Sequence, residues 1–256
     1  MLFRSFLATD GEEWGLKGAR RYLAVAGSDA APGLATKRIH SMLTLDTVGR
    51  LGDGRLLVLG SGSATEWRHI AMGIGFTTGI ESTCVADNPG ASDHIAFHEA
   101  GIPAVQLFTG PTEDYHRPSD TADKVDVDGL LKVATWVREA IVYLASRKEP
   151  LTSTLAGATN DAPTEPKEGR KVSLGTLPDF AFGGPGVKVA SVLEGSAAAT
   201  AGILAGDVIL MVDGVPMFDL AAYQKAFLGK QPGDTMTIRV RRGEKDVELE
   251  ATLTAR

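Results

Sequence analysis

The stretch TDGEEWGLKGA, residues 9–19, decides the fold because it places two adjacent glutamates between a strand-like and a helix-like segment. Residues 2–8, LFRSFLA, are apolar and typical of a strand, and residues 14–26 carry the apolar spacing of a helix. Open α/β sheets build their sites outside the carboxyl ends of their strands. Glu12 and Glu13 are therefore candidate site residues, although a helix dipole alone also favours carboxylates at a helix N-terminus.

Strand-like and helix-like segments alternate through the first 148 residues. Apolar runs predict strands at 42–46, 56–60 and 102–108, and helical spacing predicts helices at 63–75, 93–101 and 126–147. This alternation predicts an α/β domain with a mostly parallel or mixed sheet and helices on both faces. On the last helix, we expect an inner stripe of apolar side chains at Leu130, Val133, Val137, Ile141 and Leu144.

The composition changes at residues 149–170, which are rich in Pro, Thr, Ala and charge and show no sustained period. Such a segment is typical of a linker. After it, short strands and turns predominate. The sequence therefore predicts a first domain at 1–148, a linker at 149–170 and a second domain at 171–256.

The bulk composition excludes several classes of protein. A net charge of −6 argues against a nucleic-acid partner or an anionic membrane surface, since either would require a basic face. No apolar run approaches the roughly 18–20 residues that a membrane-spanning helix needs. Cys84 is the only cysteine, so no disulfide within the chain and no thiolate metal cluster can form, and we expect it to be a small buried hydrophobic residue.

Further polar residues follow the predicted strands of the first domain. Asp46 ends one strand and His116 lies in the loop after another, while residues 92–94 form a loop-to-helix junction. If these strands share one sheet, the polar residues converge on one edge with Glu12 and Glu13. Carboxylate and imidazole ligands without thiols suit a catalytic zinc or a similar divalent ion. A carboxylate that does not bind the metal can then act as general base toward water.

Four motifs carry a resemblance to a known family. FRSFLATDGEEWGLKGARRYL, LTLDTVGR, SDHIAFHEAGIPAV and YHRPSDTADKVD resemble, in order and spacing, the co-catalytic zinc aminopeptidases of the twenty-eighth peptidase family. The resemblance covers about residues 1–148. It implies a mixed-sheet zinc-exopeptidase domain of the phosphorylase/hydrolase-like fold, with two zinc ions per intact domain.

The resemblance also assigns roles to individual residues. Glu12 would be the general base, Glu13 and His116 ligands of the first zinc, and Asp46 a ligand of the second. Hydrogen bonds from the motif at 92–94 would orient those ligands. The members of that motif are Ser92, Asp93 and His94.

Two departures from the family pattern stand out. Thr44 and Thr47 flank Asp46 where the family usually has Asn and Met, a variation that keeps the ligand. The family also takes a histidine and a metal-bridging aspartate from a segment upstream of the two glutamates, and the chain begins only eleven residues before Glu12. We therefore expect an amino-terminally truncated catalytic domain with an incomplete metal site. The other histidines, His40, His69 and His98, do not match the missing ligand and are expected on the surface or in packing.

Residues 171–256 resemble a PDZ domain of the protease-associated kind, through VSLGTLPDF, GVKVASVLEGSAAATAGILAGDVILMVDGVPM and PGDTMTIRVRRGEKDVELEATL. The resemblance implies that the SLGT loop binds a peptide carboxylate and that the peptide adds as a strand beside a helix beginning near Asp219. The implied peptide-binding residues are Ser173, Leu174, Gly175, Thr176, Leu220, Tyr223 and Phe227. For the three helix residues, a place in the hydrophobic core is an equally good interpretation.

The leading hypothesis is thus a zinc metallopeptidase that removes amino-terminal residues from peptides, with a PDZ domain that binds a peptide carboxyl terminus. A non-catalytic fragment acting as a PDZ peptide-binding module is the competing hypothesis. A zinc-dependent cyclase or carboxypeptidase on the same fold is a third. We expect no nucleic-acid or membrane partner. The chain does not fix the compartment, but relatives with this domain pair are usually exported, which implies a periplasmic or extracellular parent protein.

Overall fold

The computed structural model describes residues 5–26, 39–86, 92–155, 171–180, 182–218 and 220–255. The chain divides into two compact units, unit 1 at Met1–Pro163 and unit 2 at Thr164–Arg256. Residues 156–170 of the expected linker lie outside the described residues, as does Asp219. No helix in the described ranges is both long enough and apolar enough to cross a bilayer.

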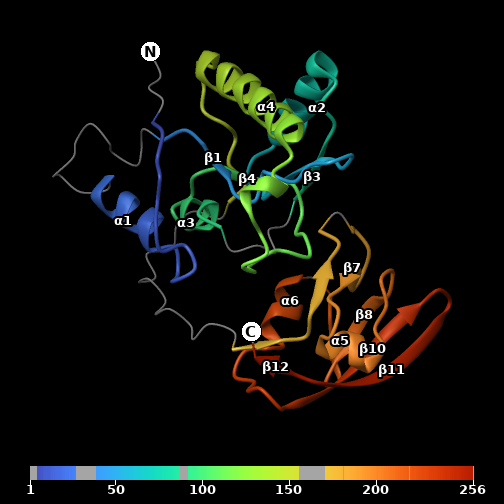
Figure 1. Ribbon diagram of the computed structural model, residues 1–256. Helices are drawn as coiled ribbons and strands as arrows, with labels where there is room; N and C mark the ends of the chain where they lie inside the picture. The colour runs from blue at the N-terminus through green and yellow to red at the C-terminus, as the bar shows by residue number, and fades with distance from the viewer. Residues whose placement is uncertain are drawn as a thin grey trace. The chain divides into compact units, whose positions relative to one another are not determined.

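Unit 1 is built on a four-stranded mixed sheet (Figure 1). Its strands, in the order β1-β4-β2-β3, are β1 (Met42–Leu45), β4 (Ala104–Phe108), β2 (Leu56–Leu59) and β3 (Ser82–Val85). β1 pairs with β4 in parallel and β2 with β3 in parallel, whereas β2 and β4 are antiparallel. The predicted mixed α/β architecture is confirmed, and β3 is an additional strand that its polar residues hid from the sequence pattern.

Helices cover both faces of this sheet (Figure 1). One face packs against α2 (Trp67–Thr78) and α4 (Val127–Ser146), and the other against α1 (Lys17–Ala26) and α3 (His94–Glu99). Two short 3-10 turns, η3 (Ser61–Ser63) and η4 (Ala122–Lys124), complete the unit. Along β4, Val105 and Leu107 belong to the first core and Ala104 to the second, as the alternation of strand side chains requires.

The buried stripe of α4 agrees only in part with the expected one: Val133 lies in the core, and Val137 and Leu144 pack against it from half-buried positions. Gly129, Val133, Trp136 and Ala140 are buried, whereas Leu130 is 37% exposed. Gly129, which has no side chain, and Ala140, which has only a methyl group, let α4 approach its neighbours closely. The indole of Trp136 fills the core between these two positions of the helix. Of the predicted stripe, only Val133 is fully buried.

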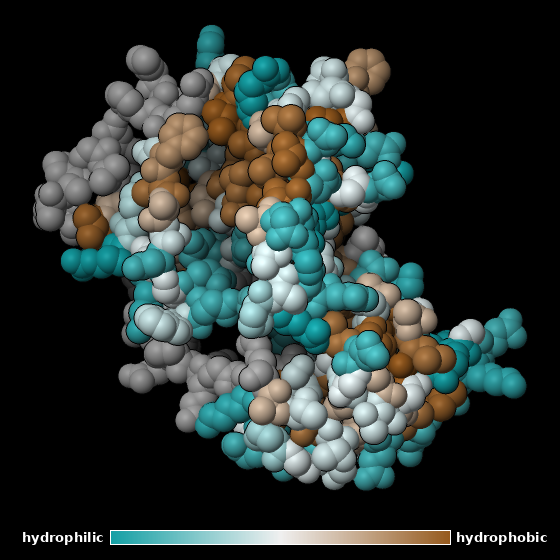
Figure 2. All heavy atoms as spheres, in the orientation of Figure 1, coloured by the Kyte–Doolittle hydropathy of each residue, from teal (hydrophilic) through white to brown (hydrophobic). Residues whose placement is uncertain are grey.

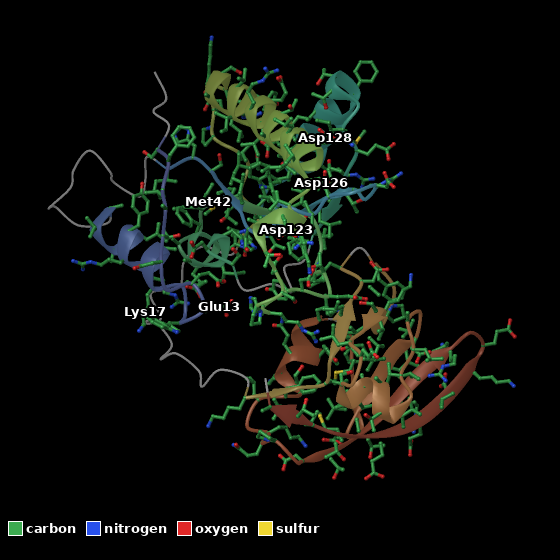
Figure 3. The ribbon with its side chains drawn as sticks, in the orientation of Figure 1. Glu13, Lys17, Met42, Asp123, Asp126 and Asp128 are labelled. Atoms are coloured by element: carbon green, nitrogen blue, oxygen red, sulfur yellow. The ribbon has the colours of Figure 1, made fainter. Side chains whose placement is uncertain are left out.

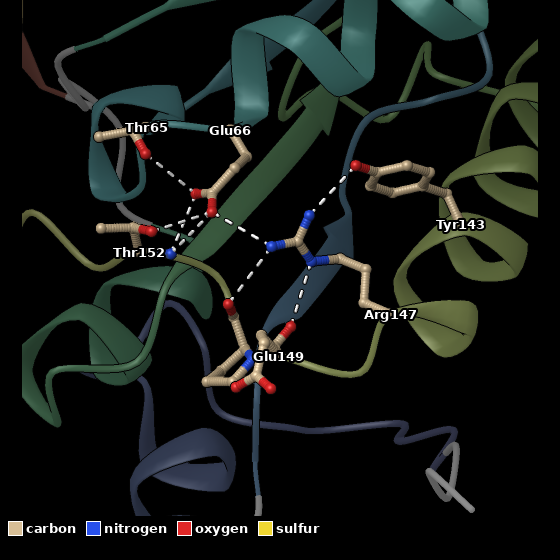
Figure 4. A network of polar contacts seen from close by, with 7 residues as sticks. Thr65, Glu66, Tyr143, Arg147, Glu149 and Thr152 are labelled. Carbon is tan, nitrogen blue, oxygen red and sulfur yellow. Dashed lines mark hydrogen bonds and ion pairs between the residues drawn. The ribbon is translucent and has the colours of Figure 1, made fainter.

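The start of the expected linker is packed onto unit 1 (Figure 4). Leu151 is 6% exposed and belongs to the core beneath α2 and α4. The Glu66 carboxylate accepts hydrogen bonds from the backbone N–H of Thr152 at 3.0 Å and from Arg147 at 3.3 Å. Burial alone would raise the pKa of Glu66, but the hydrogen bonds from Thr152 and Thr65 lower it below its ordinary value. Residues 149–155 are therefore part of unit 1.

The segment around the paired glutamates differs from the expected strand-to-helix junction. Residues 5–10 form no regular strand, and α1 begins at Lys17, three residues later than predicted. Gly11, Gly15 and Leu16 all have positive φ, at 64°, 90° and 59°. Left-handed residues cannot continue a right-handed helix, so residues 11–16 form a compact turn that carries both glutamates.

Apolar side chains gather on the outer surface of unit 1 over α4 (Figure 2). They line a shallow groove whose apolar members include Phe6, Leu45, Val137, Ile141 and Val142. Phe6 is 85% exposed and Val142 53%. Val137 and Ile141 of the expected inner stripe are half-buried and border this apolar groove.

Unit 2 is dominated by an antiparallel sheet with the strand order β11-β10-β8-β7-β6 (Figure 1). Its strands are β5 (Val172–Ser173), β6 (Thr176–Pro178), β7 (Val187–Val192), β8 (Val208–Val212), β9 (Val215–Pro216), β10 (Thr235–Arg242), β11 (Lys245–Thr252) and β12 (Thr254–Ala255). β9 pairs with β8, and β12 pairs with β5. The helices are α5 (Ala197–Ala201) and α6 (Leu220–Lys225). This β-rich architecture agrees with the prediction for the second half of the chain.

A buried ion pair fixes the turn before β8. Asp207 is 1% exposed, and its two carboxylate oxygens accept from the Arg242 guanidinium at 2.8 and 2.7 Å. The backbone N–H of Leu204 donates to the same carboxylate at 2.9 Å. Burial alone would raise the pKa of Asp207, but the guanidinium and the backbone donor hold it below its ordinary value of 3.8. This carboxylate ties β10 to the helix–strand turn.

We predict that Asp207→Asn lowers the free energy of unfolding of unit 2 by about 2 kcal/mol at pH 7, because a charged hydrogen-bond acceptor is lost. Since folding depresses the pKa of Asp207, its contribution is present above pH 3.8 and is lost as the pH falls through the lowered value. Hydrogen exchange of the β8 and β10 amides measures the change. Asp246→Asn, in an exposed ion pair with Arg241, is the matched control and should change little. Equal protection in both variants would contradict the prediction.

Candidate active site

The parallel pairing of β1 and β4 brings two loops to one edge of the unit 1 sheet. Their register aligns Leu45 with Leu107, so both strands end at the same edge. Asp46 follows β1 directly, and the backbone N–H of Thr109 donates to the carbonyl of Thr47 at 3.0 Å. The loop that leads to His116 therefore leaves the sheet beside Asp46.

Glu13 and His116 meet across this edge although they are far apart in the sequence. The imidazole Nε2 of His116 lies 3.0 Å from Oε1 of Glu13, with the two side chains 42% and 59% exposed. Glu13 lies on the turn before α1 (Figure 3). His116 has a φ of 58°, and its ring stacks on Tyr115 at 4.0 Å between centroids. The left-handed backbone of His116 and the stacking of its ring on Tyr115 together orient the imidazole toward Glu13.

Glu12 is half-buried beside the other carboxylates. Burial, together with the negative charges of Glu13, Asp46 and Asp93, raises its pKa to about 7. All four carboxylates are thus close enough to interact electrostatically. A carboxyl group with a pKa near neutrality can both accept and release a proton under physiological conditions.

Asp46 is held by two donors. The Gln106 amide donates to one carboxylate oxygen at 3.2 Å and the Thr47 hydroxyl to the other at 3.1 Å. Gln106 is 5% exposed and sits within the apolar strand β4. Sequence reasoning missed this residue, although a polar side chain in an otherwise apolar strand is a signal that could have found it.

The motif at residues 92–94 is buried behind the carboxylates. Ser92, Asp93 and His94 are at most 7% exposed, and the Thr9 hydroxyl donates to Asp93, which joins the residues before Glu12 to α3. Burial, together with the neighbouring His98, lowers the pKa of His94 to about 3, so His94 is neutral at physiological pH. The motif is joined to the segment before Glu12 through Thr9, and its predicted role in orienting the ligands stays a prediction.

The donor atoms at this edge match zinc in type but not in number. A carboxylate and an imidazole 3.0 Å apart are the ligand types of catalytic zinc sites, which have three protein ligands. In the described parts of the chain, no three His, Cys, Asp or Glu side chains are grouped so that they could hold one metal ion. Glu13 and His116 have the donor types of zinc ligands, and their role as ligands stays a prediction, because the described residues alone do not make a complete centre.

The loop predicted to bind a peptide carboxylate lies between β5 and β6 in unit 2. Gly175 has a φ of 84°, and a Cβ there would collide with Ser196 at the start of α5. The carbonyls of Leu174 and Gly175 accept from the backbone of Ala198 and Leu193 at 2.7 and 2.8 Å. Only glycine fits this position, because both the backbone conformation and the close approach exclude a side chain.

Of the helix residues predicted for peptide binding, most are in the core. Phe227 is 0% exposed and Tyr223 3%, and Leu220 packs against the same core from a partly exposed position. Leu174, from the loop, is also fully buried. Ser173 and Thr176 remain partly exposed.

Residues 5–141 match peptidase family M28, which is more than half of the chain. The chain belongs to this family. It is 30% identical over 163 residues to aminopeptidase YwaD of Bacillus subtilis, an alignment that covers 59% of the chain and 33% of that protein. A solved structure of an aminopeptidase from Aneurinibacillus sp. strain AM-1 is 28% identical, with a TM-score of 0.45 over 58% of this chain and 34% of that one.

Residues 159–253 of this M28 chain match the PDZ domain. The chain is also 25% identical to the serine protease Do-like HtrA of Lactobacillus helveticus, over 90% of the chain and 58% of that protein. The chain therefore spans about one third of the length of aminopeptidase YwaD and just under three fifths of the length of the HtrA protein.

We predict that Gln106→Leu lowers the free energy of unfolding of unit 1 by about 1–3 kcal/mol, because Asp46 loses a buried amide donor. Urea unfolding followed by tryptophan fluorescence measures this change for unit 1 alone, since Trp14, Trp67 and Trp136 all lie in it. Thr77→Val is a control, because its hydroxyl bonds only carbonyls of its own helix. An unchanged or increased stability of Gln106→Leu would contradict the assigned hydrogen bond.

Proposed function

We propose that unit 1 is a zinc-dependent peptidase unit that acts on the amino-terminal residues of peptides. The contact of Glu13 with His116 carries the proposal, since it joins two predicted ligands across 103 positions of the M28 unit. The similarity to an aminopeptidase supports the substrate class. Glu13 and His116 would hold one zinc ion, and Asp46 a second, each together with further ligands.

A zinc ion at this edge would act as a Lewis acid toward the scissile carbonyl. Glu12 is the residue of the chain proposed to exchange protons: its carboxylate, half-buried beside Glu13, would take a proton from the attacking water and give it to the leaving amine. Gln106 and Thr47 keep the Asp46 carboxylate in place. Asp93, joined to Thr9, holds the turn that carries Glu12 against α3.

Unit 2 is proposed to bind the carboxyl-terminal residues of a peptide. The PDZ match and the glycine-bearing loop between β5 and β6 support this role. A peptide would add as a strand along β6, which lies at one end of the sheet order. The backbone N–H groups of residues 174–176 would receive its carboxylate.

A second candidate is that this chain binds peptides through unit 2 without hydrolysing them. The described residues supply no group of three metal ligands, and this observation favours it. The two candidates differ in a measurable quantity, namely zinc-dependent turnover.

We predict that His116→Ala and Glu13→Gln each weaken zinc binding by roughly tenfold or more, since even residues that only support a ligand contribute that much. Zinc titration of the metal-free 256-residue chain, followed by calorimetry, measures the affinity. His69→Ala is the matched control, because His69 is exposed on α2 and distant in sequence from every predicted ligand. If His116→Ala bound zinc as tightly as the unaltered chain, the proposed ligand pair would be wrong.

We predict that Glu12→Gln leaves zinc affinity nearly unchanged but lowers turnover of an aminoacyl chromogenic substrate by about 10²-fold or more, as loss of a general base does. The glutamine keeps the shape of the side chain and removes its proton-accepting charge. Loss of zinc in proportion to activity would make Glu12 a ligand instead. Absence of zinc-dependent turnover in the unaltered chain would support the second candidate.

A further inference from the structure

The edge of β6 that would receive a peptide lacks one backbone hydrogen-bond donor. The carbonyl of Gly175 accepts from Leu193 N and the N–H of Asp179 donates to Lys188 O, each at 2.8 Å, so these residues face β7. Because successive residues of a strand point their backbone groups to alternate sides, Thr176 and Pro178 face the other edge. Pro178 has no N–H. A peptide strand would therefore pair mainly with Thr176 and with the loop before it.

The side chain of Thr176 is bonded across this edge to α6. The Tyr223 and Thr176 hydroxyl oxygens lie 2.6 Å apart and share a hydrogen bond. Tyr223 is 3% exposed, and its ring packs edge-on against the buried Phe227 at 4.9 Å between centroids. The ring is thus a packed part of the unit 2 core, with its hydroxyl end at the first residue of β6.

This position is where the last side chain of a bound peptide would have to go. The side chain of a carboxyl-terminal residue is attached one carbon from its carboxylate, and the carboxylate would be held at residues 174–176. The space immediately beside Thr176, between β6 and α6, contains the phenol of Tyr223. A large terminal side chain could enter only by breaking the hydrogen bond and displacing a packed ring, whereas a methyl group or a hydrogen requires neither.

We propose that Tyr223 is a size filter that restricts the peptide site of unit 2 to peptides ending in a small residue such as alanine or glycine. This inference rests on the proposed peptide-binding function of unit 2 and adds its specificity. Because strand pairing along β6 is limited by Pro178, the terminal residue contributes a large share of the binding contacts. Tyr223 therefore acts on the peptide residue that contributes this large share of the binding contacts.

The test uses acetylated decapeptides that differ only in a final alanine or leucine, with carboxyl-amidated versions of both, bound to the 256-residue chain and followed by fluorescence anisotropy. We expect the leucine peptide to bind roughly tenfold or more weakly than the alanine peptide, because overpacking a core is costly. In Tyr223→Leu, which vacates ring volume, the difference should narrow to about twofold or reverse, since burying a leucine side chain is favourable. Tyr223→Phe keeps the ring and is the matched control, so it should retain the preference.

Each outcome bears on one of the two proposals. Equal binding of both peptides by the unaltered chain, or a preference for leucine, overturns the size filter while leaving peptide binding intact. A preference that persists in Tyr223→Leu, or that disappears in Tyr223→Phe, also overturns it. Equal binding of amidated and free peptides, or no binding by any variant, overturns the carboxylate-binding function and the filter with it. Hydrogen exchange of the β8 and β10 amides shows that each variant is folded.

Discussion

The parallel pairing of β1 with β4 is the interaction on which the rest of unit 1 depends. Although β2, α2, β3 and α3 lie between β1 and β4 in the sequence, the pairing makes β1 and β4 end at the same edge. The loops after them then carry Asp46 and His116 into the neighbourhood of the turn at residues 11–16. A shift of one residue in this register would move Gln106 from the α1–α3 face to the opposite core and leave Asp46 without its amide donor.

The electrostatic cost of this convergence is visible at Glu12. Four carboxylates share one edge, and burial together with the charges of the other three raises the pKa of Glu12 to about 7. Like charges gathered in this way are disfavoured unless a cation or a proton compensates them. The same arrangement that strains the edge electrostatically gives it a group that titrates near neutral pH, which is the property that proton transfer requires.

The sequence predicted the architecture better than the local geometry. The periodicity of apolar residues and the composition predicted the mixed sheet, its helices and the β-rich second unit, because these features follow from the spacing at which apolar residues recur along the chain. They predicted a strand at 2–8, of which residues 2–4 lie outside the described residues and residues 5–8 form no strand. They also misplaced the start of α1, because the positive φ of Leu16 is not encoded in an apolar pattern. The stripe of α4 agreed with its prediction only in part, since glycine and alanine can be buried for close approach as well as for hydrophobicity. Gln106 owes its role to Asp46, a partner that is distant in sequence, and no local pattern contains such a partner.

Pro178 has a consequence beyond peptide recognition. The outermost strand of a sheet is a template on which a second molecule can polymerise, and natural sheets interrupt that template with proline. β6 is such a terminal strand, it is only three residues long, and Pro178 is its last residue. The β6 edge of unit 2 can thus pair with a short extended peptide, while Pro178 hinders the strand-to-strand association of many copies into fibrils at the same edge.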